Sequence, residues 1–414
     1  MKSKTINTGI FLLVEKLTKI ISSLIIISLV AKSYELKEFG NYAYHMAIFT
    51  IFSMVINFGS EQMIVYESSK YKKFQLSDYF FLRLFSAIIC SIILKILVLL
   101  DFVNASYYTI FCISFLSQTI YVMIPYYQGL MNYRNTSIAV SLAIVLSLIM
   151  KCYLVVVDDA LNISLLITLD TLFISTGLSL IYFFDKNIII RFYFFNSRKI
   201  KKIAINCFPL FVSAIGIIIY ARSDQVIIKH LMDDASTGLY SSVIKLSEVF
   251  TFILPIGVNL SLSIVAKYLN KDKDKSKHYL MLFKISNIYA LSCIIFLYFF
   301  NESIILLLYT EEFLQAVNIL SVYSVSLLFM SMGSMSNVWL IDKGLQKYKV
   351  YRVIFGVVLN IALNLVLIPN YGLIGAAIAT VISQFFSSFV ANSFTKETRS
   401  LFFLQLNSLK VYKW

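Results

Sequence analysis

Long apolar segments alternate with short polar or charged segments along the chain of 414 residues. A hydrocarbon core about 30 Å thick is crossed by about 20 helical residues, and the apolar segments have this length. Twelve membrane-spanning helices are therefore predicted, over residues 8–30, 42–65, 79–100, 107–127, 137–157, 161–184, 204–229, 239–266, 279–300, 316–340, 350–368 and 373–394. The pattern predicts an all-α integral membrane protein.

The composition agrees with this prediction and narrows the possible functions. Hydrophobic residues make up 59% of the chain and charged residues only 14%, whereas an ordinary soluble domain has about 25% charged residues. The net charge of +14 taken alone would favour a nucleic-acid-binding protein, so the positions of the Lys and Arg residues along the chain decide between the two. The five cysteines fall inside predicted helices and lack metal or redox spacing, so neither a metal nor another cofactor is expected.

The Lys and Arg residues fall on alternate loops, which is the positive-inside pattern of membrane proteins. Both termini are thus predicted to be cytoplasmic, and residues 395–414 are predicted to form an amphipathic cytoplasmic tail. Because Glu15, Lys16 and Lys19 interrupt the first apolar segment, this segment is predicted to stay as a helix rather than to be cleaved as a signal peptide.

Two regions of the chain resemble each other in the same order. The stretch "FGNYAYHMAIFTIFSMVINFG" at 39–59 aligns with "TGLYSSVIKLSEVFTFILPIG" at 237–257, and the loop "GLMNYR" at 129–134 aligns with "GLQKYK" at 344–349. The first alignment pairs Gly40 with Gly238 and Tyr42 with Tyr240 at an offset of 198. Since each copy holds six predicted helices, both copies run in the same direction, as parallel repeats do.

This duplication predicts two six-helix lobes around a central cavity. The N-terminal lobe with its basic linker is assigned to residues 1–200, the C-terminal lobe to 201–394 and the tail to 395–414. The linker at 185–202 is interpreted as a cytoplasmic crossover, and a helix lying on anionic lipid is the alternative.

The stretch "LNIALNLVLIPNYGLIGAAIATVIS" at 359–383 is predicted to form a helical hairpin. Pro369 and Gly372 suit the reversal between its two helices. Asn360 and Asn364 are interpreted as residues that cap and pack helices rather than bind substrate. Gly375 and Ala379 form a small-residue face that allows close helix packing.

Together with "EFGNY", "YARSDQVIIK", "GLYSSVIKLSE" and "GLQKYK", this hairpin resembles the polysaccharide-transporter branch of the multidrug/oligosaccharidyl-lipid/polysaccharide exporter superfamily, and more narrowly the Wzx-type O-antigen flippases. The resemblance implies a non-enzymatic flippase in the bacterial cytoplasmic (inner) membrane. It would move undecaprenyl-diphosphate-linked oligosaccharide from the cytoplasmic to the outer leaflet. The partners implied are this substrate, membrane lipids and the polymerase and chain-length proteins of the same pathway, with no nucleic acid.

Charged residues inside predicted helices are the candidate site, because a charge in the membrane is costly and faces protein or water. An anionic diphosphate needs cations, so the substrate-binding candidates are Arg222, Lys16, Lys19, Arg83 and Lys245. The candidates for ion coupling or ion pairing are Asp224, Glu248, Glu61 and Asp170. For Lys245 with Glu248, and for Glu15 with Lys19, an ion pair within one helix is the alternative.

Two other functions remain as alternatives. A cation-coupled multidrug antiporter of the same superfamily would need an embedded acidic site, and the deep cations outnumber such acids. A membrane polysaccharide polymerase would need large outer loops, whereas the longest predicted outer loop here is 301–315. The favoured mechanism is alternating access, in which two lobes rock about a site near the membrane midplane.

Overall fold

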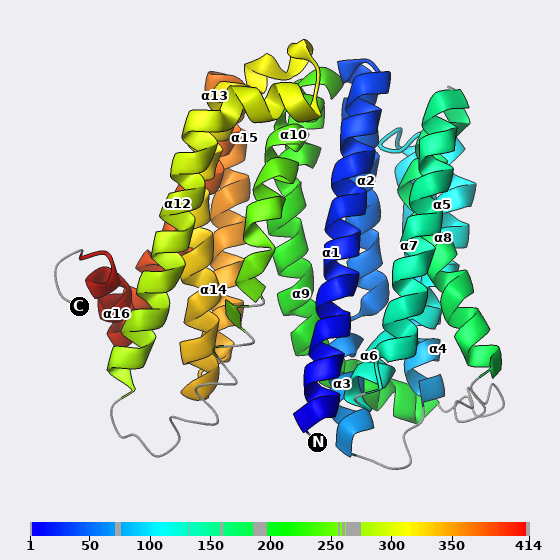
Figure 1. The fold of residues 1–414 in the computed structure, drawn as a ribbon, viewed down its shortest axis with the longest axis horizontal. Helices are drawn as coiled ribbons and strands as arrows, with labels where there is room; N and C mark the ends of the chain where they lie inside the picture. Colours follow the sequence, from blue (N-terminus) through cyan, green and yellow to red (C-terminus); the bar gives the residue numbers. More distant parts are fainter. Residues whose placement is uncertain are drawn as a thin grey trace. The chain divides into compact units, whose positions relative to one another are not determined.

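The computed structural model describes residues 2–70, 76–130, 132–157, 160–184, 197–255, 257–258, 261 and 275–410. Residues 185–196 of the predicted linker and residues 256, 259–260 and 262–266 of the predicted span 239–266 lie outside the described residues. The described part of the chain is all-helical, as predicted, and contains no β-strand (Figure 1).

The first half of the chain forms a series of long helices joined by short turns. In chain order these are α1 (Lys2–Ser33), α2 (Leu36–Asn57), α3 (Ser60–Lys70), α4 (Leu76–Leu99), η1 (Ala105–Tyr107), α5 (Tyr108–Ser117), η2 (Gln118–Val122), α6 (Met123–Gly129), α7 (Arg134–Val157) and α8 (Ala160–Phe184).

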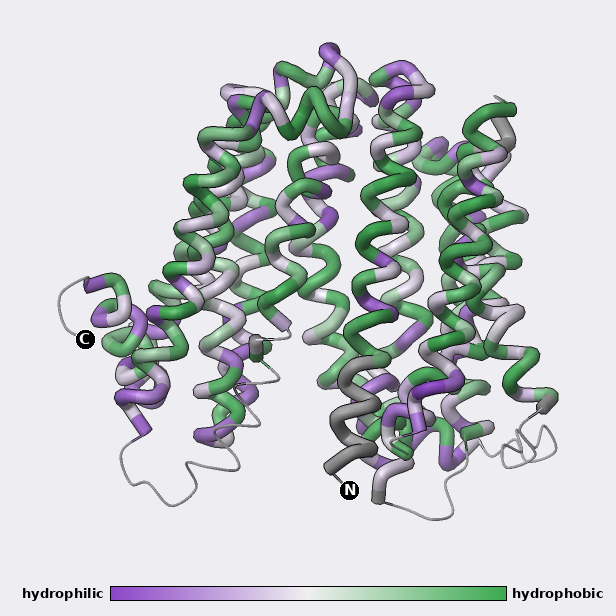
Figure 2. Tube along the Cα trace, viewed as in Figure 1, coloured by the Kyte–Doolittle hydropathy of each residue, from purple (hydrophilic) through white to green (hydrophobic). Residues whose placement is uncertain are grey.

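The second half begins with the 35-residue helix α9 (Ser197–Leu231). It continues with α10 (Asp234–Thr251), α12 (Ser276–Leu308), η3 (Glu311–Gln315), α13 (Ala316–Ser324), α14 (Ser326–Asp342), α15 (Lys347–Ser388), η4 (Val390–Ser393) and α16 (Arg399–Ser408). Hydrophobic residues dominate the long helices of both halves, and hydrophilic residues gather toward many helix ends (Figure 2).

Eight helices of the described residues are long and apolar enough to cross a membrane, and a pair bent by 41° at 311–342 makes nine. One of the eight, 347–393, contains two of the predicted spans. The predicted span 8–30 lies in α1, where three charged residues lower the apolar character, and the span 239–266 is only partly described. The eight helices, the bent pair, the second span within 347–393, the span in α1 and the partly described span together correspond to the twelve predicted segments.

One predicted span is interrupted. The helix predicted over 42–65 ends at Asn57, and α3 begins at Ser60. Phe58 and Gly59 between them have φ values of 50° and 64°, a left-handed conformation that a continuous helix does not contain. A Cβ on Gly59 would lie 2.5 Å from the backbone nitrogen of Phe211, so α9 approaches this break closely.

The predicted hairpin at 359–383 is confirmed by its contacts. Helix α15 is broken at Gly372, whose φ of 59° and ψ of −142° are not helical. A Cβ on Gly375 would lie 2.2 Å from the carbonyl oxygen of Leu367, and the amide of Asn360 reaches Ser383 at 3.5 Å. The two parts of α15 therefore run antiparallel to each other.

The chain divides into two compact units. Unit 1 comprises residues 1–35 and 45–218, and unit 2 comprises 36–44 and 219–414. In unit 1, α7 packs on α1 and on α8, and α4 packs on α5. In unit 2, α12 packs on α13, α14 and α16, while α15 packs on α13 and α14. The predicted domain limits at 200 and 394 stay a prediction.

Candidate functional site

The first cluster of charges joins α9 and α10 in unit 2. Arg222 Nη2 lies 2.8 Å from Glu248 Oε1, and Lys245 Nζ lies 3.0 Å from Glu248 Oε2. The side chain of Arg222 is 11% exposed and that of Lys245 is 15% exposed, whereas that of Glu248 is 40% exposed. Two cations thus share one carboxylate, and this arrangement leaves one positive charge in excess.

Arg222 also keeps unused hydrogen-bonding capacity. Its buried Nε has no hydrogen-bond partner among the described residues. An arginine can bind phosphate oxygens through two parallel N–H donors, and this Nε would become available to an anion only if a rearrangement of the helices exposed it. The predicted pair of Lys245 and Glu248 within α10 is confirmed, but the bridge from α9 was not predicted.

The second cluster surrounds Asp224, which is only 3% exposed. Asn364 Nδ2 donates to Oδ1 of Asp224 at 2.6 Å. The hydroxyls of Thr380 and Tyr240 donate to Oδ2 at 2.7 and 2.9 Å. No Lys or Arg forms an ion pair with Asp224 within the described residues. A buried carboxylate held only by neutral donors is suited to bind a proton or a small cation.

The oxygen atoms around Asp224 define what it could hold. The amide oxygen of Asn364 is buried without a hydrogen-bond partner, and Asn360 Oδ1 accepts from Ser223 at 3.1 Å. Side-chain oxygens of this kind are ligands of hard cations. No group of three His, Cys, Asp or Glu residues suited to a metal occurs in the described residues.

The two asparagines therefore do more than the sequence indicated. Both are fully buried and pack the hairpin, as predicted, but Asn364 is also a direct partner of Asp224. Sequence reasoning did not connect them because Asp224 precedes Asn364 by 140 residues. Thr380 carried no separate signal within its apolar helix, and Tyr240 was noted only as a repeat position, not as a partner of Asp224.

In unit 1, the two candidate lysines of α1, Lys16 and Lys19, differ in their ion-pair partners. Lys19 is paired with Glu15 at 2.8 Å, and Tyr133 donates a hydrogen bond to the other oxygen of Glu15. The charge of Lys19 is thus already balanced, as the alternative stated. Lys16 is half-buried and forms no ion pair with any described residue. Of the two lysines, Lys16 is therefore the better candidate for binding an anionic substrate.

Arg83 has partners that explain its burial without a substrate. It is 2% exposed, and it donates from Nε to Ser60 at 2.9 Å and from Nη2 to Asn57 at 2.7 Å. Both acceptors flank the break between α2 and α3. Glu61, beside the same break, is exposed and forms no ion pair with Arg83 at contact distance in the described structure.

The remaining acidic candidate, Asp170 of α8, is paired with Lys151 of α7. Their side chains are 2.7 Å apart, and Ser147 also donates to Asp170. Asp170 is 39% exposed, whereas Lys151 is 5% exposed. This pair neutralises both charges and connects α7 to α8 within their apolar segments.

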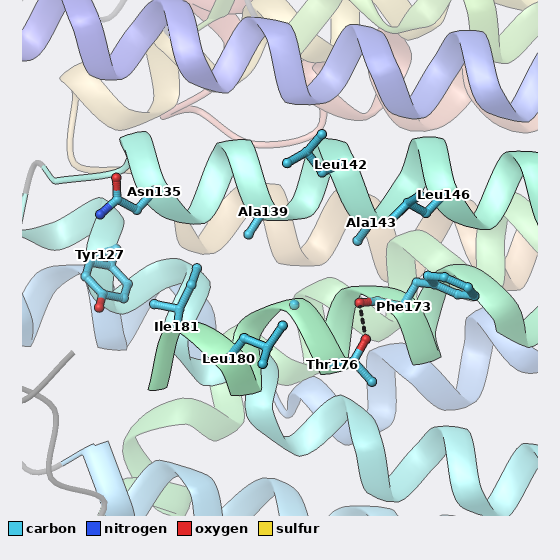
Figure 3. Close-up of a pocket in the computed structure, with 11 residues that line it drawn as sticks. Tyr127, Asn135, Ala139, Leu142, Ala143, Leu146, Phe173, Thr176, Leu180 and Ile181 are labelled. Carbon is cyan, nitrogen blue, oxygen red and sulfur yellow. Dashed lines mark hydrogen bonds between the residues drawn. The ribbon is translucent and has the colours of Figure 1, made fainter. Parts of the chain in front are cut away.

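A groove of about 710 Å³ lies beside this pair, between α7 and α8 (Figure 3). Ala139, Ala143 and Gly177 are small residues on its two walls, and Leu142 and Leu180 at its edge are more than half exposed. It contains none of the candidate charges. Its apolar lining suits a hydrocarbon chain.

Apolar helices long enough to cross a membrane, with charged clusters between them, indicate a multi-pass membrane protein. Residues 5–254 match the polysaccharide biosynthesis protein family, and the chain belongs to that family. Residues 209–366 also match the MatE family.

Solved structures share the fold. The lipid II flippase MurJ in an inward closed conformation is 15% identical and has a TM-score of 0.78, covering 98% of this chain and 91% of MurJ. An inward-facing multidrug resistance MATE family transporter of the MOP superfamily is 14% identical with a TM-score of 0.68, covering 94% and 95% of the two chains. The fold is therefore that of the MOP exporter superfamily, as the sequence resemblance implied.

Two relatives match part of the chain. An uncharacterized membrane protein of Methanocaldococcus jannaschii is 26% identical over 275 residues, which are 62% of this chain and 63% of that protein. The capsular polysaccharide biosynthesis protein CapF of Staphylococcus aureus is 27% identical over 278 residues, 63% of this chain and 67% of CapF. The match thus spans less than two thirds of the archaeal relative.

Proposed function

We propose that this protein is a flippase for undecaprenyl-diphosphate-linked oligosaccharide, which it moves from the cytoplasmic to the outer leaflet for O-antigen, capsule or exopolysaccharide synthesis. The observation that carries the proposal is the excess positive charge of the cluster formed by Arg222, Lys245 and Glu248. A positive charge within apolar helices is retained only where it has a use or a partner. An anionic diphosphate would supply the missing negative charge.

Two further observations support a lipid-linked anion as the substrate. The groove between α7 and α8 has an apolar lining that fits a hydrocarbon chain. Lys16 adds a half-buried cation without an ion-pair partner among the described residues. The family match and the relative named for capsular polysaccharide favour a sugar-linked lipid over other anionic lipids.

Asp224 is the residue that we propose couples transport to an ion gradient. Binding of a proton or a small monovalent cation would neutralise its buried charge and change its hydrogen bonds to the hairpin of α15. Alternating access follows if this change biases the lobes between inward and outward openings. In this proposal both termini lie in the cytoplasm of a bacterial cell.

A multidrug antiporter is the second candidate, because residues 209–366 match the MatE family. Such a transporter would bind cationic substrates at an embedded acid. Glu248 and Asp170 are already paired with cations, and Asp224 is enclosed by three neutral donors. Because these three acids already have partners, they are poor sites for a cationic drug, and this favours the flippase.

Deleting the gene tests the proposal. The deletion strain should accumulate undecaprenyl-diphosphate oligosaccharide on the cytoplasmic side of the membrane and lose surface polysaccharide, and the restored gene should reverse both effects. Unchanged surface polysaccharide together with increased sensitivity to cationic drugs would favour the antiporter instead.

A further inference from the structure

A chain of hydrogen bonds leads from Asp224 toward the start of α9. The amide of Asn364 donates to Asp224 at 2.6 Å and to Oδ1 of Asn360 at 3.2 Å. The amide of Asn360 in turn reaches the hydroxyl of Ser383 at 3.5 Å, and this hydroxyl lies 2.7 Å from that of Tyr220. The chain joins the buried carboxylate to a tyrosine that precedes it by one helical turn. We call Asn360, Ser383 and Tyr220 the polar route.

Three of the helical segments around Asp224 change character at this level. Asp224, Asn364 and Thr380 come from α9 and from the two parts of α15, and about one turn toward the start of α9 these segments carry the polar route. About one turn in the opposite direction they carry three apolar residues, which we call the apolar layer: Ile228, Ile368 and Ala376. These residues are 0%, 2% and 0% exposed. Thr237 of α10 is also fully buried, and its hydroxyl donates to the carbonyl of Asp233 at 2.9 Å.

Tyr220 stands at the accessible end of the polar route. Asn360 and Ser383 are fully buried, whereas Tyr220 is half-buried. Gly356 lies one turn before Asn360 on α15, and a Cβ there would lie 3.6 Å from the ring of Tyr220 and 2.9 Å from the side chain of Ser387. The absence of a side chain at Gly356 leaves room for the tyrosine ring, which covers this end of the route.

The predicted topology gives this asymmetry a direction. The segments that precede α9 and α15 carry the basic residues that place them in the cytoplasm. The polar route therefore points to the cytoplasm, and the apolar layer points to the outside. A cation that drives transport enters the cell down the membrane potential, so it leaves its site toward the cytoplasm. The polar route lies where such an exit is needed.

We infer that in this conformation Asp224 exchanges its ion with the cytoplasm along the polar route, and that the apolar layer closes the site to the outside. The inference rests on the ion-coupling role proposed for Asp224. Oxygen atoms along the route replace the water of a small cation as it moves. The apolar layer would remove that water and offer no ligand in exchange. The ring of Tyr220 controls the inner end of the route.

The first experiment uses the silver ion, a monovalent cation that binds cysteine thiolates, as the probe of access. Ser383→Cys on the polar route is compared with Ala376→Cys in the apolar layer, each in the full chain with the five native cysteines replaced by alanine. Both positions lie on the second part of α15 and are fully buried. Silver is added to right-side-out or inside-out membrane vesicles, and the remaining thiols are measured with a fluorescent maleimide after denaturation.

Silver should react with Ser383→Cys several-fold faster from the cytoplasmic side than from the outside. From the cytoplasmic side it should also react several-fold faster with Ser383→Cys than with Ala376→Cys. Equal rates from the two sides, equal rates at the two positions, or no reaction of Ser383→Cys from the cytoplasmic side would overturn the inference.

The second experiment tests whether Tyr220 covers the route. The trimethylammonium reagent MTSET, which is larger than silver, should react with Ser383→Cys from the cytoplasmic side in combination with Tyr220→Ala but not with Tyr220→Phe, which keeps the ring. Tyr298→Ala is the matched control on α12, where Tyr298 is 62% exposed. Tyr220→Leu takes the place of Tyr220→Ala if that variant does not fold. No gain of reaction on removal of the ring, or an equal gain in the control, would refute the role of Tyr220.

Neither measurement contains substrate or an ion gradient. A failure here overturns the route and leaves the proposed flippase activity untouched, whereas the response of Asp224→Asn to a gradient decides the proposed coupling by itself.

Discussion

Arg83 and Arg222 are both arginines inside apolar helices, but their partners differ. Arg83 donates to two neutral side chains at a helix break, and this contact stabilises the fold. Arg222 shares one carboxylate with Lys245, and its Nε is buried without a hydrogen-bond partner among the described residues. The two arginines look alike in the sequence, and this difference in partners is why we propose a substrate role for Arg222 and a structural role for Arg83.

Substituting Arg83 should therefore reduce stability. In Arg83→Ala, Asn57 and Ser60 lose their buried donor, and the expected cost is about 2–3 kcal/mol in the free energy of unfolding. Thermal unfolding of the purified protein in detergent measures it. Lys95→Ala in the same helix is the control, because Lys95 is exposed and should change stability by less than about 0.5 kcal/mol. Equal effects of the two substitutions would contradict the structural role of Arg83.

Asp224→Asn should uncouple transport from its driving ion. The variant keeps the size of the side chain and removes the charge, so insertion should be normal while the response to a proton or sodium gradient disappears. Flipping in vesicles with and without an imposed gradient measures this. Ser223→Ala is the control, since it loses the bond to Asn360 but leaves the carboxylate. A variant that still responds to the gradient would refute the role of Asp224.

The helices themselves were largely predictable, because segments of about 20 apolar residues follow directly from the thickness of a membrane. The hairpin of α15 was also predictable, from Pro369 and Gly372. The break at Phe58 was missed, although the sequence marks it with Gly59 and the polar residues Asn57, Ser60, Glu61 and Gln62 inside the predicted span 42–65. The close approach of α9 to Gly59 could not be seen in the sequence. The charges of the site were visible in the sequence, whereas their partners on other helices were not.

Gly59 offers a test of that break. In Gly59→Ala the positive φ costs about 1–2 kcal/mol, and the new Cβ would also meet Phe211 at 2.5 Å. Gly344→Ala is the matched control, because Gly344 has a φ of 70° and no atom within 4 Å of an added Cβ. The melting temperature should fall clearly further for Gly59→Ala. A similar fall in both variants would show that α9 does not pack against the break.

For the molecule as a whole, we propose a pseudo-symmetric pair of parallel repeats. Gly40 and Gly238, which the repeat aligns, also meet in unit 2: a Cβ on Gly40 would lie 3.1 Å from the nitrogen of Gly238, and a Cβ on Gly238 would lie 3.2 Å from that of Gly40. Two residues that the repeat aligns therefore meet closely within unit 2.

The topology of the whole chain can be checked with reporter fusions. Fusions after Lys199 and Lys347 should be cytoplasmic, and a fusion after Glu311 should lie outside, because the basic loops face the cytoplasm. The paired use of an enzyme active only outside and a fluorescent protein active only inside distinguishes the two sides. An outside signal after Lys347 would overturn the orientation and with it the direction of transport.

The central claim is that a cation cluster within the membrane binds the diphosphate of a lipid-linked sugar. The most direct measurement compares flipping of undecaprenyl-diphosphate oligosaccharide by vesicles containing wild type, Arg222→Gln or the control Lys95→Gln, at equal amounts of folded protein. Arg222→Gln should lose at least about tenfold in transport, since a bond to a charged group contributes about 1.5–3 kcal/mol, and Lys95→Gln should match the wild type. Full transport by correctly folded Arg222→Gln would contradict the account.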